Sequence, residues 1–439
     1  MTSNLASIPD RRAIEALRNG VPNRDAVRVL GCNQPDVEAR FSAQLSGVPA
    51  ATDADSQVPG MLVAGGFGSG KSHLLEYLEH LGLSENFVVS RVVISKETPL
   101  FDPAKVFRAA VESASVPGQT GIAIPEVALR LRPDSHSYAS LYKWANHPDS
   151  NMAAIFPATL MLHERLNNDP ELTELIQNFW AGDPLPIAKL RDGLRQIGEA
   201  AAFSLKAVKA KELTEQRFRF VARLMQGAGY RGWILLIDEV ELVGRYSLVQ
   251  RGRSYAELAR WMGKIEGLQI PGITTVAAIT DDFALAVLKR KGDGDYVGPR
   301  LRDKGTDEYL ALAPRAEAGM RIIERDAITL QPPTEEMLLE TYERLKGIHA
   351  RAYTWDPPSI AAADLAMRRA MRSHVRRWMN EWDLKRLYPG ASVSTEEQEL
   401  RPTYEEDVVL EEQSPDDEER EVKPDVGYEA LIRALEEQP

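Results

Sequence analysis

One short stretch constrains the fold of this 439-residue chain more than any other: LVAGGFGSGKSHLLEYL, from Leu62 to Leu78. It begins within an apolar run, Met61–Ala64, that has the character of a short buried strand. Four glycines then fall within six residues, and an apolar pattern with helical spacing follows over Ser72–Leu81. A strand, a glycine-rich turn and a helix in direct succession are typical of an α/β fold with a parallel sheet.

The glycines also match a phosphate-binding pattern, G-x-x-x-x-G-K-[ST]. Glycines let the backbone curl around an anion, and the amides at the start of a helix point toward it. Lys71 would bring positive charge to the terminal phosphates of a nucleotide, and the Ser72 hydroxyl would bind Mg²⁺. The alternative is a glycine-rich turn without function. The predicted nucleotide-binding residues here are Gly65, Gly66, Phe67, Gly68, Ser69, Gly70, Lys71, Ser72 and His73.

A second motif, GWILLIDEVELV, begins at Gly232. Its apolar run, Trp233–Ile237, predicts a buried parallel strand that ends at Asp238 and Glu239. Ligands of open α/β sheets lie at the carboxyl ends of strands. We therefore predict that Asp238 binds Mg²⁺ and that Glu239 orients or deprotonates an attacking water. The alternative is a pair of acids that caps the next helix.

A third strand is predicted at Ile273–Ile279, within GITTVAAITDD. It ends in Thr280, followed by Asp281 and Asp282. A polar side chain at this point can contact a γ-phosphate or the attacking water. The alternative for these residues is again a cap on the following helix.

Strand character elsewhere outlines an α/β core over residues 58–332. A further strand is predicted at Phe87–Ser95 and a helix at Asp102–Ala114. Residues 117–215 lack strand signals, so we expect a helical insertion there.

Flanking segments complete the organisation. Residues 1–57 are predicted to be a helical N-terminal segment, and the small and polar residues 47–59 predict a loop before the first strand. Residues 333–390 contain two long helical stretches, Thr334–Tyr353 and Ile360–Leu387, and residues 391–439 form an acidic tail.

The order of these features resembles that of the AAA+ ATPases, nearest to their initiator and loader branch. Five stretches together resemble the BREX phage-defence ATP-binding proteins of the BrxD type, over about residues 10–390. They are RRAIEALRNGVPNRDAVRVLG, GGFGSGKSHLLEYL, LIDEVELVGR, RSYAELARWMG and RRWMNEWDLKRLYP. In the first stretch, Val21, Pro22 and Arg24 are similar to an element that packs on adenine, with Asp25 at its acidic position.

This resemblance implies ATP and Mg²⁺ as cofactors and residues 333–390 as a helical lid. It also implies a homo-oligomer that acts on double-stranded DNA with a helicase or a methyltransferase of a defence system. The neighbouring subunit of such an oligomer would place an arginine at the γ-phosphate. Arg300 and Arg302, in a stretch expected to be a loop, are the candidates, with Arg290 weaker; the alternative is solvated loop arginines.

The basic stretch Met367–Tyr388 is predicted to be an amphipathic helix of the lid. The resemblance implies that one of its arginines reaches the nucleotide, and we select Arg376. Two alternatives are a row of arginines that contacts the DNA backbone and a solvated helix face.

Composition excludes several other classes of protein. The single cysteine, Cys32, excludes an intrachain disulfide and zinc sites built from paired cysteines. The longest apolar runs fall well short of the roughly 18 residues of a membrane span, and the N-terminus has no apolar core of a signal peptide. We therefore expect a cytoplasmic protein without a membrane partner.

Charge is concentrated at the C-terminus. Residues 396–439 contain 17 acidic and 4 basic residues and so carry −13, whereas the whole chain carries −12 and the remaining 395 residues +1. Residues 396–425 hold few large apolar groups, so we predict that they are disordered. Asp425–Gln438 is predicted to be a short helix whose apolar stripe docks in a partner's groove; the alternative is a solubilising tail.

Together these features predict an oligomeric Mg²⁺-dependent ATPase that remodels or loads a DNA-directed partner in anti-phage defence. The alternative is an ATP-gated switch or scaffold with slow turnover that recruits such a partner to DNA. A third class, the signalling NTPases, ordinarily carries an effector or repeat sensor domain, and no pattern of either kind is found in the sequence.

Overall fold

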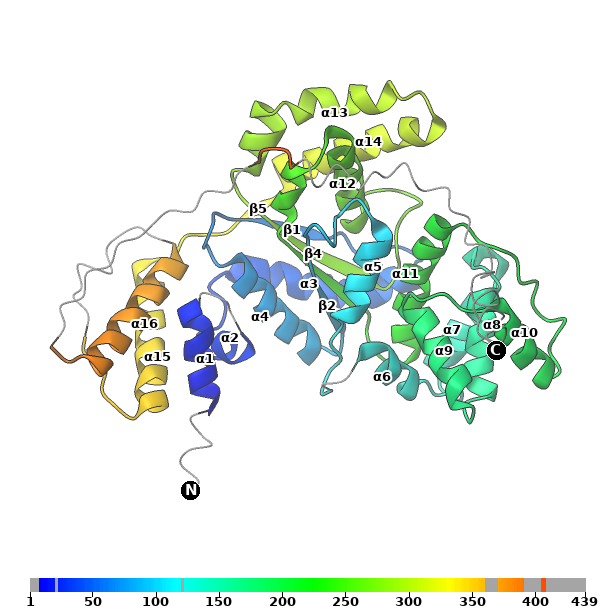
Figure 1. The fold of residues 1–439 in the computed structure, drawn as a ribbon, viewed down its shortest axis with the longest axis horizontal. Helices are drawn as coiled ribbons and strands as arrows, with labels where there is room; N and C mark the ends of the chain where they lie inside the picture. Colours follow the sequence, from blue (N-terminus) through cyan, green and yellow to red (C-terminus); the bar gives the residue numbers. More distant parts are fainter. Residues whose placement is uncertain (1–7, 20–22, 120–121, 360–369, 391–403, 408–439) are drawn as a thin grey trace, which may run out of the picture.

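A computed structural model of the chain describes residues 8–19, 23–119, 122–359, 370–390 and 404–407. Its centre is a sheet of five parallel strands in the order β2-β3-β4-β1-β5, as Figure 1 shows. The predicted α/β class with a parallel sheet is therefore confirmed. The short edge strand β5 was not expected from the sequence. The strands are β1 (Met61–Ala64), β2 (Val88–Val93), β3 (Trp233–Asp238), β4 (Ile273–Ile279) and β5 (Ile328–Thr329).

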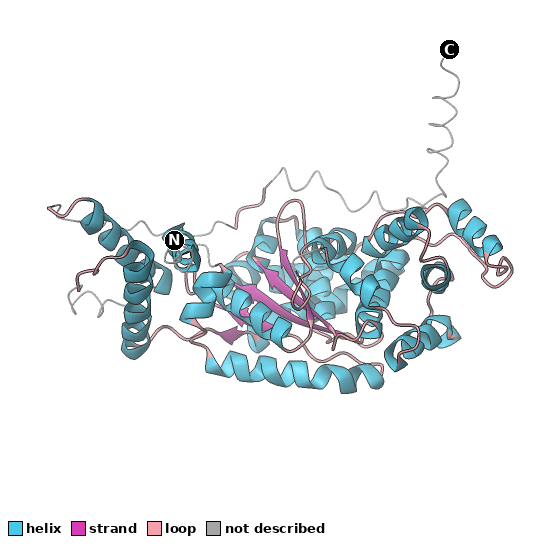
Figure 2. Ribbon diagram, turned by 90° about the horizontal axis from the view of Figure 1, so that it is seen from below, coloured by secondary structure: helices cyan, strands magenta, loops and turns pink. Residues whose placement is uncertain are grey.

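Both faces of the sheet are covered by helices (Figure 2). Every residue of β1, β3 and β4 is buried, as expected for parallel strands enclosed on both sides. Side chains alternate between two cores: Met61 and Val63 join the core of α3 and α4, and Leu62 joins the core on the opposite face. The covering helices are α3 (Pro35–Asp53) and α4 (Lys71–Ser84) on one face, and α5 (Pro103–Glu112), α11 (Ala210–Gly227) and α12 (Leu248–Trp261) on the other.

The loop predicted at residues 47–59 is partly wrong, because α3 continues to Asp53. Val48 is buried in the core with β1 and α4, and the Thr52 hydroxyl donates to the carbonyl of Val48. Tertiary packing therefore maintains the helix through residues whose small and polar composition favours a loop.

Of residues 117–215, predicted to be a helical insertion, the described part contains helices and no strand. Phe156 and Trp180 of these helices pack on Phe220 of α11, with ring centroids 5.0 and 5.8 Å from that of Phe220. These helices extend to one side of the sheet (Figure 1). They are α6 (Ala123–Arg130), α7 (His136–Asn146), η1 (Pro148–Ser150), α8 (Ile155–Arg165), α9 (Pro170–Ala181) and α10 (Ile187–Gln196).

A group of helices above the sheet in Figure 1 is organised around α12 and α14. Arg251 of α12 is buried and forms two hydrogen bonds with the buried Asp293, which also accepts from the Tyr255 hydroxyl. The loop predicted around Arg300 and Arg302 is wrong, since both lie in helix α13. The other elements here are η2 (Val240–Arg245), η3 (Ala284–Arg290), α13 (Asp293–Arg302), α14 (Asp307–Arg321) and η4 (Ile322–Asp326).

Helices from the N-terminal part of the chain and from residues 335–387 form one helical cluster beside the sheet (Figure 1). Its core contains Tyr342, Trp378 and Trp382, and Arg18 pairs with Asp383 at 2.6 Å. The helix predicted at Thr334–Tyr353 is present. Of the stretch predicted at Ile360–Leu387, residues 360–369 lie outside the described part. The cluster comprises α1 (Ile8–Asn19), α2 (Arg24–Leu30), α15 (Glu335–Tyr353) and α16 (Met371–Leu387).

Four residues of the acidic tail, Tyr404–Asp407, are described and pack on the core. The predicted disorder of residues 396–425 is therefore wrong for this segment. The reason is that its charges meet basic side chains of the body, which the composition of the tail does not reveal. The predicted helix at Asp425–Gln438 lies outside the described residues. Among those that are described, no helix is long and apolar enough to span a membrane.

Candidate nucleotide-binding site

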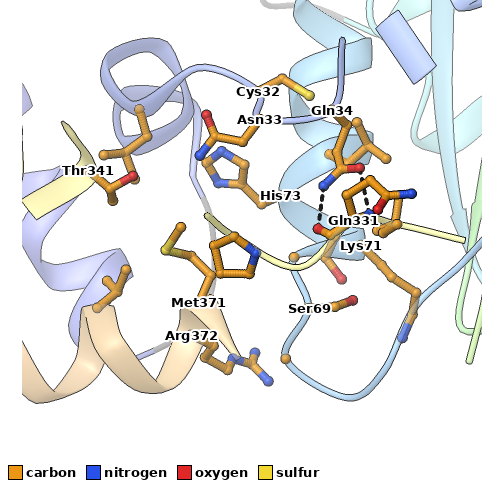
Figure 3. A pocket seen from close by; sticks show the side chains of 18 of the residues that line it. Cys32, Asn33, Gln34, Ser69, Lys71, His73, Gln331, Thr341, Met371 and Arg372 are labelled. Carbon is orange, nitrogen blue, oxygen red and sulfur yellow. Dashed lines mark hydrogen bonds between the residues drawn. The ribbon is translucent and has the colours of Figure 1, made fainter. Parts of the chain in front are cut away.

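A pocket lies between the sheet and the helical cluster, at the carboxyl end of β1 (Figure 3). One wall is the glycine-rich loop and the start of α4, and the other comes from α15, α16 and the connection between α2 and α3. Segments that are far apart in the sequence, from Leu17 to Val375, therefore line one pocket.

The glycine-rich loop adopts the backbone that the motif requires. Gly68 and Gly70 have φ of 79° and 101°, values that disfavour any residue with a Cβ. Gly70 also precedes α4 directly, so the first amides of that helix point into the pocket. Lys71 is buried, and its Nζ donates to the Gly65 carbonyl at 2.9 Å and lies 3.7 Å from Glu241 Oε1. The loop thus presents amides and one cation to an anion.

Asp238 ends β3 and is buried beside the loop. Its Oδ2 accepts from Arg91 Nη2 at 3.2 Å, and its Oδ1 accepts from the amide of Glu239 at 3.0 Å. Arg91 also donates to the carbonyl of Ser72 at 3.3 Å. Asp238 and Ser72, the two predicted Mg²⁺ ligands, are therefore connected through one guanidinium.

Glu239 has φ of 60°, in the left-handed region that a residue with a side chain rarely adopts. It stands at the N-cap of η2 but makes no capping hydrogen bond with its side chain, so the capping alternative is not supported. Burial raises the pKa of Glu239, and the neighbouring Asp238 charge adds to this effect. An unusual backbone at a half-buried acid with a raised pKa is typical of a functional position.

Glu241 is a buried acid that the sequence analysis missed. Burial raises the pKa of this carboxyl to about 7, although the charge of Lys71 opposes the shift. Its Oε2 is buried without a hydrogen-bond partner, and the side chain lines the pocket. The sequence contains one indication of its role: Glu241 follows Glu239 by two residues, in DEVE.

Thr280 follows β4, which lies between β1 and β3 in the sheet. The amide of Gly65 donates to the carbonyl of Ile279 at 3.1 Å, which places the end of β4 against the start of the loop. Thr280 is buried, and its hydroxyl lies 2.7 Å from the Tyr404 hydroxyl. The N-cap of the next helix is Phe283, without a side-chain hydrogen bond, so Thr280 and the two aspartates do not cap it.

The pocket end away from Lys71 is formed by residues that sequence reasoning did not select. They come from the α2–α3 connection: Leu30, Gly31, Cys32, Asn33 and Gln34.

Hydrogen bonds hold this connection in place. Gln34 and Gln331 exchange two hydrogen bonds, of 2.9 and 3.0 Å, drawn as dashed lines in Figure 3. His73 Nε2 lies 2.8 Å from the Gly31 carbonyl, and burial lowers the pKa of His73. Arg24 begins α2 at an exposed position and is not among the lining residues; Val21 and Pro22 lie outside the described residues.

Arg372 is the arginine that α16 brings to the pocket. Its guanidinium lies 5.5 Å from the centre of the Phe67 ring, and Figure 3 shows it facing the loop. Arg376, the predicted lid arginine, is exposed one turn later and does not line the pocket. The two side chains differ by about one helical turn, which sequence spacing alone does not resolve.

The predicted arginines of α13 are also absent from the pocket of this single chain. Arg300 and Arg302 are exposed, and Arg302 donates to Glu317 at 2.5 Å. Arg290 is likewise exposed, at the end of η3.

The site fits a nucleotide with Mg²⁺. Among the described residues, no cluster of three His, Cys, Asp or Glu side chains could hold a metal. Mg²⁺ in phosphoryl-transfer sites takes one or two protein ligands and completes its shell with phosphates and water. Ser72 in the first turn of α4 and Asp238 at the end of β3 suit that arrangement.

One family of known proteins matches the chain. The family described as BREX system ATP-binding protein BrxC/D matches residues 9–128 and 208–381, and residues 129–207 between them are not covered. No curated protein and no solved structure matches the chain. The matched residues include the glycine-rich loop, the Asp238–Glu239 pair, Thr280 and Arg372. The chain therefore belongs to the family of BREX system ATP-binding proteins BrxC/D.

Proposed function

We propose that this protein is a Mg²⁺-dependent ATPase of the AAA+ kind, of the BrxD type within its family, which acts in the cytoplasm. One observation carries the proposal. The glycine-rich loop, the Asp238–Glu239 pair and Thr280 follow three neighbouring parallel strands, β1, β3 and β4. Phosphate-binding amides, a metal ligand, a base and a polar sensor therefore share one edge of the sheet, where α/β proteins bind ligands.

Each side chain then has a defined part in hydrolysis. The loop amides and Lys71 bind the phosphates, and Ser72 and Asp238 hold Mg²⁺, which neutralises phosphate charge. Glu239 accepts the proton of the attacking water, and its raised pKa brings it nearer to neutral pH. Thr280 donates to the γ-phosphate. Arg372, rather than Arg376, contacts the nucleotide from residues 333–390, which we propose act as a lid.

Two substitutions test the reaction. Lys71→Ala removes the buried cation and should raise the Kd for ATP by about a hundredfold. Glu239→Gln should retain ATP binding but lower kcat by about 10²- to 10⁴-fold, the usual contribution of a general base. Lys206→Ala, at an exposed lysine, is the control. Wild-type hydrolysis by Glu239→Gln would refute the role of Glu239.

We further propose that ATP assembles a homo-oligomer on double-stranded DNA and that the complex remodels or loads a helicase or methyltransferase. Arg300 is the better candidate to reach a neighbouring nucleotide, because Arg302 is engaged by Glu317 of its own chain. Mass measurement with Mg²⁺ and a slowly hydrolysed ATP analogue, with and without DNA, tests the assembly. A monomer under all conditions would contradict it.

A second candidate, a slow ATP-gated switch, is favoured by the internal contacts of the site. Lys71 is engaged by the Gly65 carbonyl and Glu241, and Asp238 is engaged by Arg91. A nucleotide must replace these contacts, which favours slow entry into the active state. Steady-state ATPase rates with and without double-stranded DNA separate the two functions, since only the motor requires sustained turnover.

A further inference from the structure

Residues Tyr404–Asp407 of the acidic tail, here called the clasp, lie against η2, η3 and α12. Figure 1 draws them as the short red segment below the label of α13. The Tyr404 ring packs edge-on against Phe283, with centroids 5.7 Å apart. A Cβ on Gly244 would lie 2.8 Å from the Tyr404 ring, so this ring occupies space that only a glycine leaves open. The clasp is therefore seated in a shaped groove.

Three basic side chains bind the clasp. Glu406 accepts from Arg251 at 2.7 Å and lies 3.6 Å from Lys291, whose Nζ also donates to the Tyr404 carbonyl at 2.9 Å. Asp407 accepts from Arg245 at 2.9 Å, and its amide donates to the Arg245 carbonyl at 3.1 Å.

Arg251 is only 2% exposed, so its contact with Glu406 is better shielded from solvent than a surface ion pair. The groove thus fits an acidic segment that follows a tyrosine, and the chain supplies one.

The clasp engages the hydroxyl proton of Thr280. The Tyr404 hydroxyl has one proton, and it donates to Asp282 Oδ1 at 2.8 Å. A carboxylate only accepts, so this proton cannot also serve Thr280. The contact of 2.7 Å between the two hydroxyls must then be a donation from Thr280 to Tyr404. Thr280 has no second proton to donate.

Both hydrogen bonds of the Tyr404 hydroxyl also shift its pKa. Burial raises that pKa most, the hydrogen bond to Asp282 raises it further, and the hydrogen bond from Thr280 lowers it. A group that donates to the phenol oxygen stabilises the phenolate, which is the direction of the Thr280 contribution.

We propose that the clasp is an autoinhibitory element in which Tyr404 positions Thr280 so that its proton is withheld from the γ-phosphate. This inference rests on the proposed function, in which Thr280 donates to that phosphate. With the clasp seated, Thr280 presents only lone pairs toward an anion. Release of the clasp frees the proton, and by linkage a γ-phosphate favours release.

Binding of ATPγS and ADP to the full-length protein tests the proposal without requiring turnover. Tyr404→Phe retains the ring but frees Thr280, so its Kd for ATPγS should fall about tenfold, the usual scale for a hydrogen bond to a charged group. Its Kd for ADP, which lacks the γ-phosphate, should change less than about twofold. Tyr388→Phe, at an exposed tyrosine outside the site, should match the wild type.

Two further variants identify the route of the effect. When Thr280→Val is combined with Tyr404→Phe, the lower Kd for ATPγS should disappear, because the Val side chain has no hydroxyl proton to donate. Glu406→Gln weakens the contact with Arg251 and should therefore also lower the Kd for ATPγS. Equal tightening of ATPγS and ADP, or a gain that survives Thr280→Val, would overturn the proposal.

Hydrogen exchange gives a readout of the clasp itself. The amide of Asp407 is bonded to Arg245 and should exchange faster with ATPγS than with ADP. Equal exchange in the two complexes would contradict the linkage. If neither the wild type nor any variant binds ATPγS, the proposed function fails and the clasp proposal fails with it. If ATPγS binds but Tyr404→Phe has no effect, only the clasp proposal fails.

Discussion

Glu241→Gln should stabilise the protein at alkaline pH and much less at acid pH. The carboxyl of Glu241 is buried, with one oxygen that has no hydrogen-bond partner, and its pKa rises from 4.5 to about 7. A raised pKa means that the folded state binds the proton more tightly than the unfolded state does. Stability from this group is thus fully present below pH 4.5 and is lost as the pH rises through 7.

The magnitude follows from the size of the shift. Each unit corresponds to about 1.4 kcal/mol, so the ionised carboxyl costs about 3 kcal/mol above pH 8 and about 1 kcal/mol at pH 5. Gln has nearly the same shape and no charge, and it abolishes this cost. The variant should therefore exceed the wild type by about 3 kcal/mol at pH 8 and by about 1 kcal/mol at pH 5.

Thermal unfolding of both proteins between pH 5 and pH 8.5, without nucleotide, measures the difference. The gain in Tm should grow with pH up to about 7 and then level off, since no further ionisation of Glu241 occurs. Glu266→Gln, at an exposed position, is the control and should give no such trend. A constant offset between Glu241→Gln and the wild type at all pH values would refute the reasoning.

Two further predictions concern helix α16 and the packing above the sheet. Arg372→Ala should raise the Kd for ATP about tenfold, whereas Arg376→Ala should leave it unchanged, because only Arg372 lines the pocket; the reverse order in a binding titration would contradict the site geometry. Gly319→Ala should lower Tm, since its Cβ would lie 1.9 Å from the Tyr255 carbonyl oxygen. Gly347→Ala has room and should raise Tm slightly through helix propensity; equal Tm shifts in the two glycine variants would argue against this packing of α12 on α14.

Local pattern accounts for much of the core. Strands β1 and β4 lie at Met61–Ala64 and Ile273–Ile279, as their apolar runs predict, and β3 differs from its prediction by one residue. The glycine-rich loop lies between β1 and α4 as the motif requires. These features are readable because a buried strand and a tight turn depend on the residues within them.

Other features depend on contacts between distant segments. Helix α3 continues to Asp53, through residues whose composition favours a loop, because Val48 packs in the core with β1 and α4. The wall formed by Leu30–Gln34 becomes part of the pocket only because α1 and α2 pack against α15 and α16. No local pattern encodes either contact.

The sequence by itself determined the strand–loop–helix unit, the acidic pair after β3 and the polar tip of β4, since each is set by neighbouring residues. Tertiary structure alone decided that Arg372 rather than Arg376 lines the pocket, that Glu241 is buried beside Lys71, and that Tyr404 reaches Thr280 from 124 residues away. The physical reason is distance along the chain. Such contacts form only when separate elements pack on a common core, which places their side chains within a few ångströms of one another.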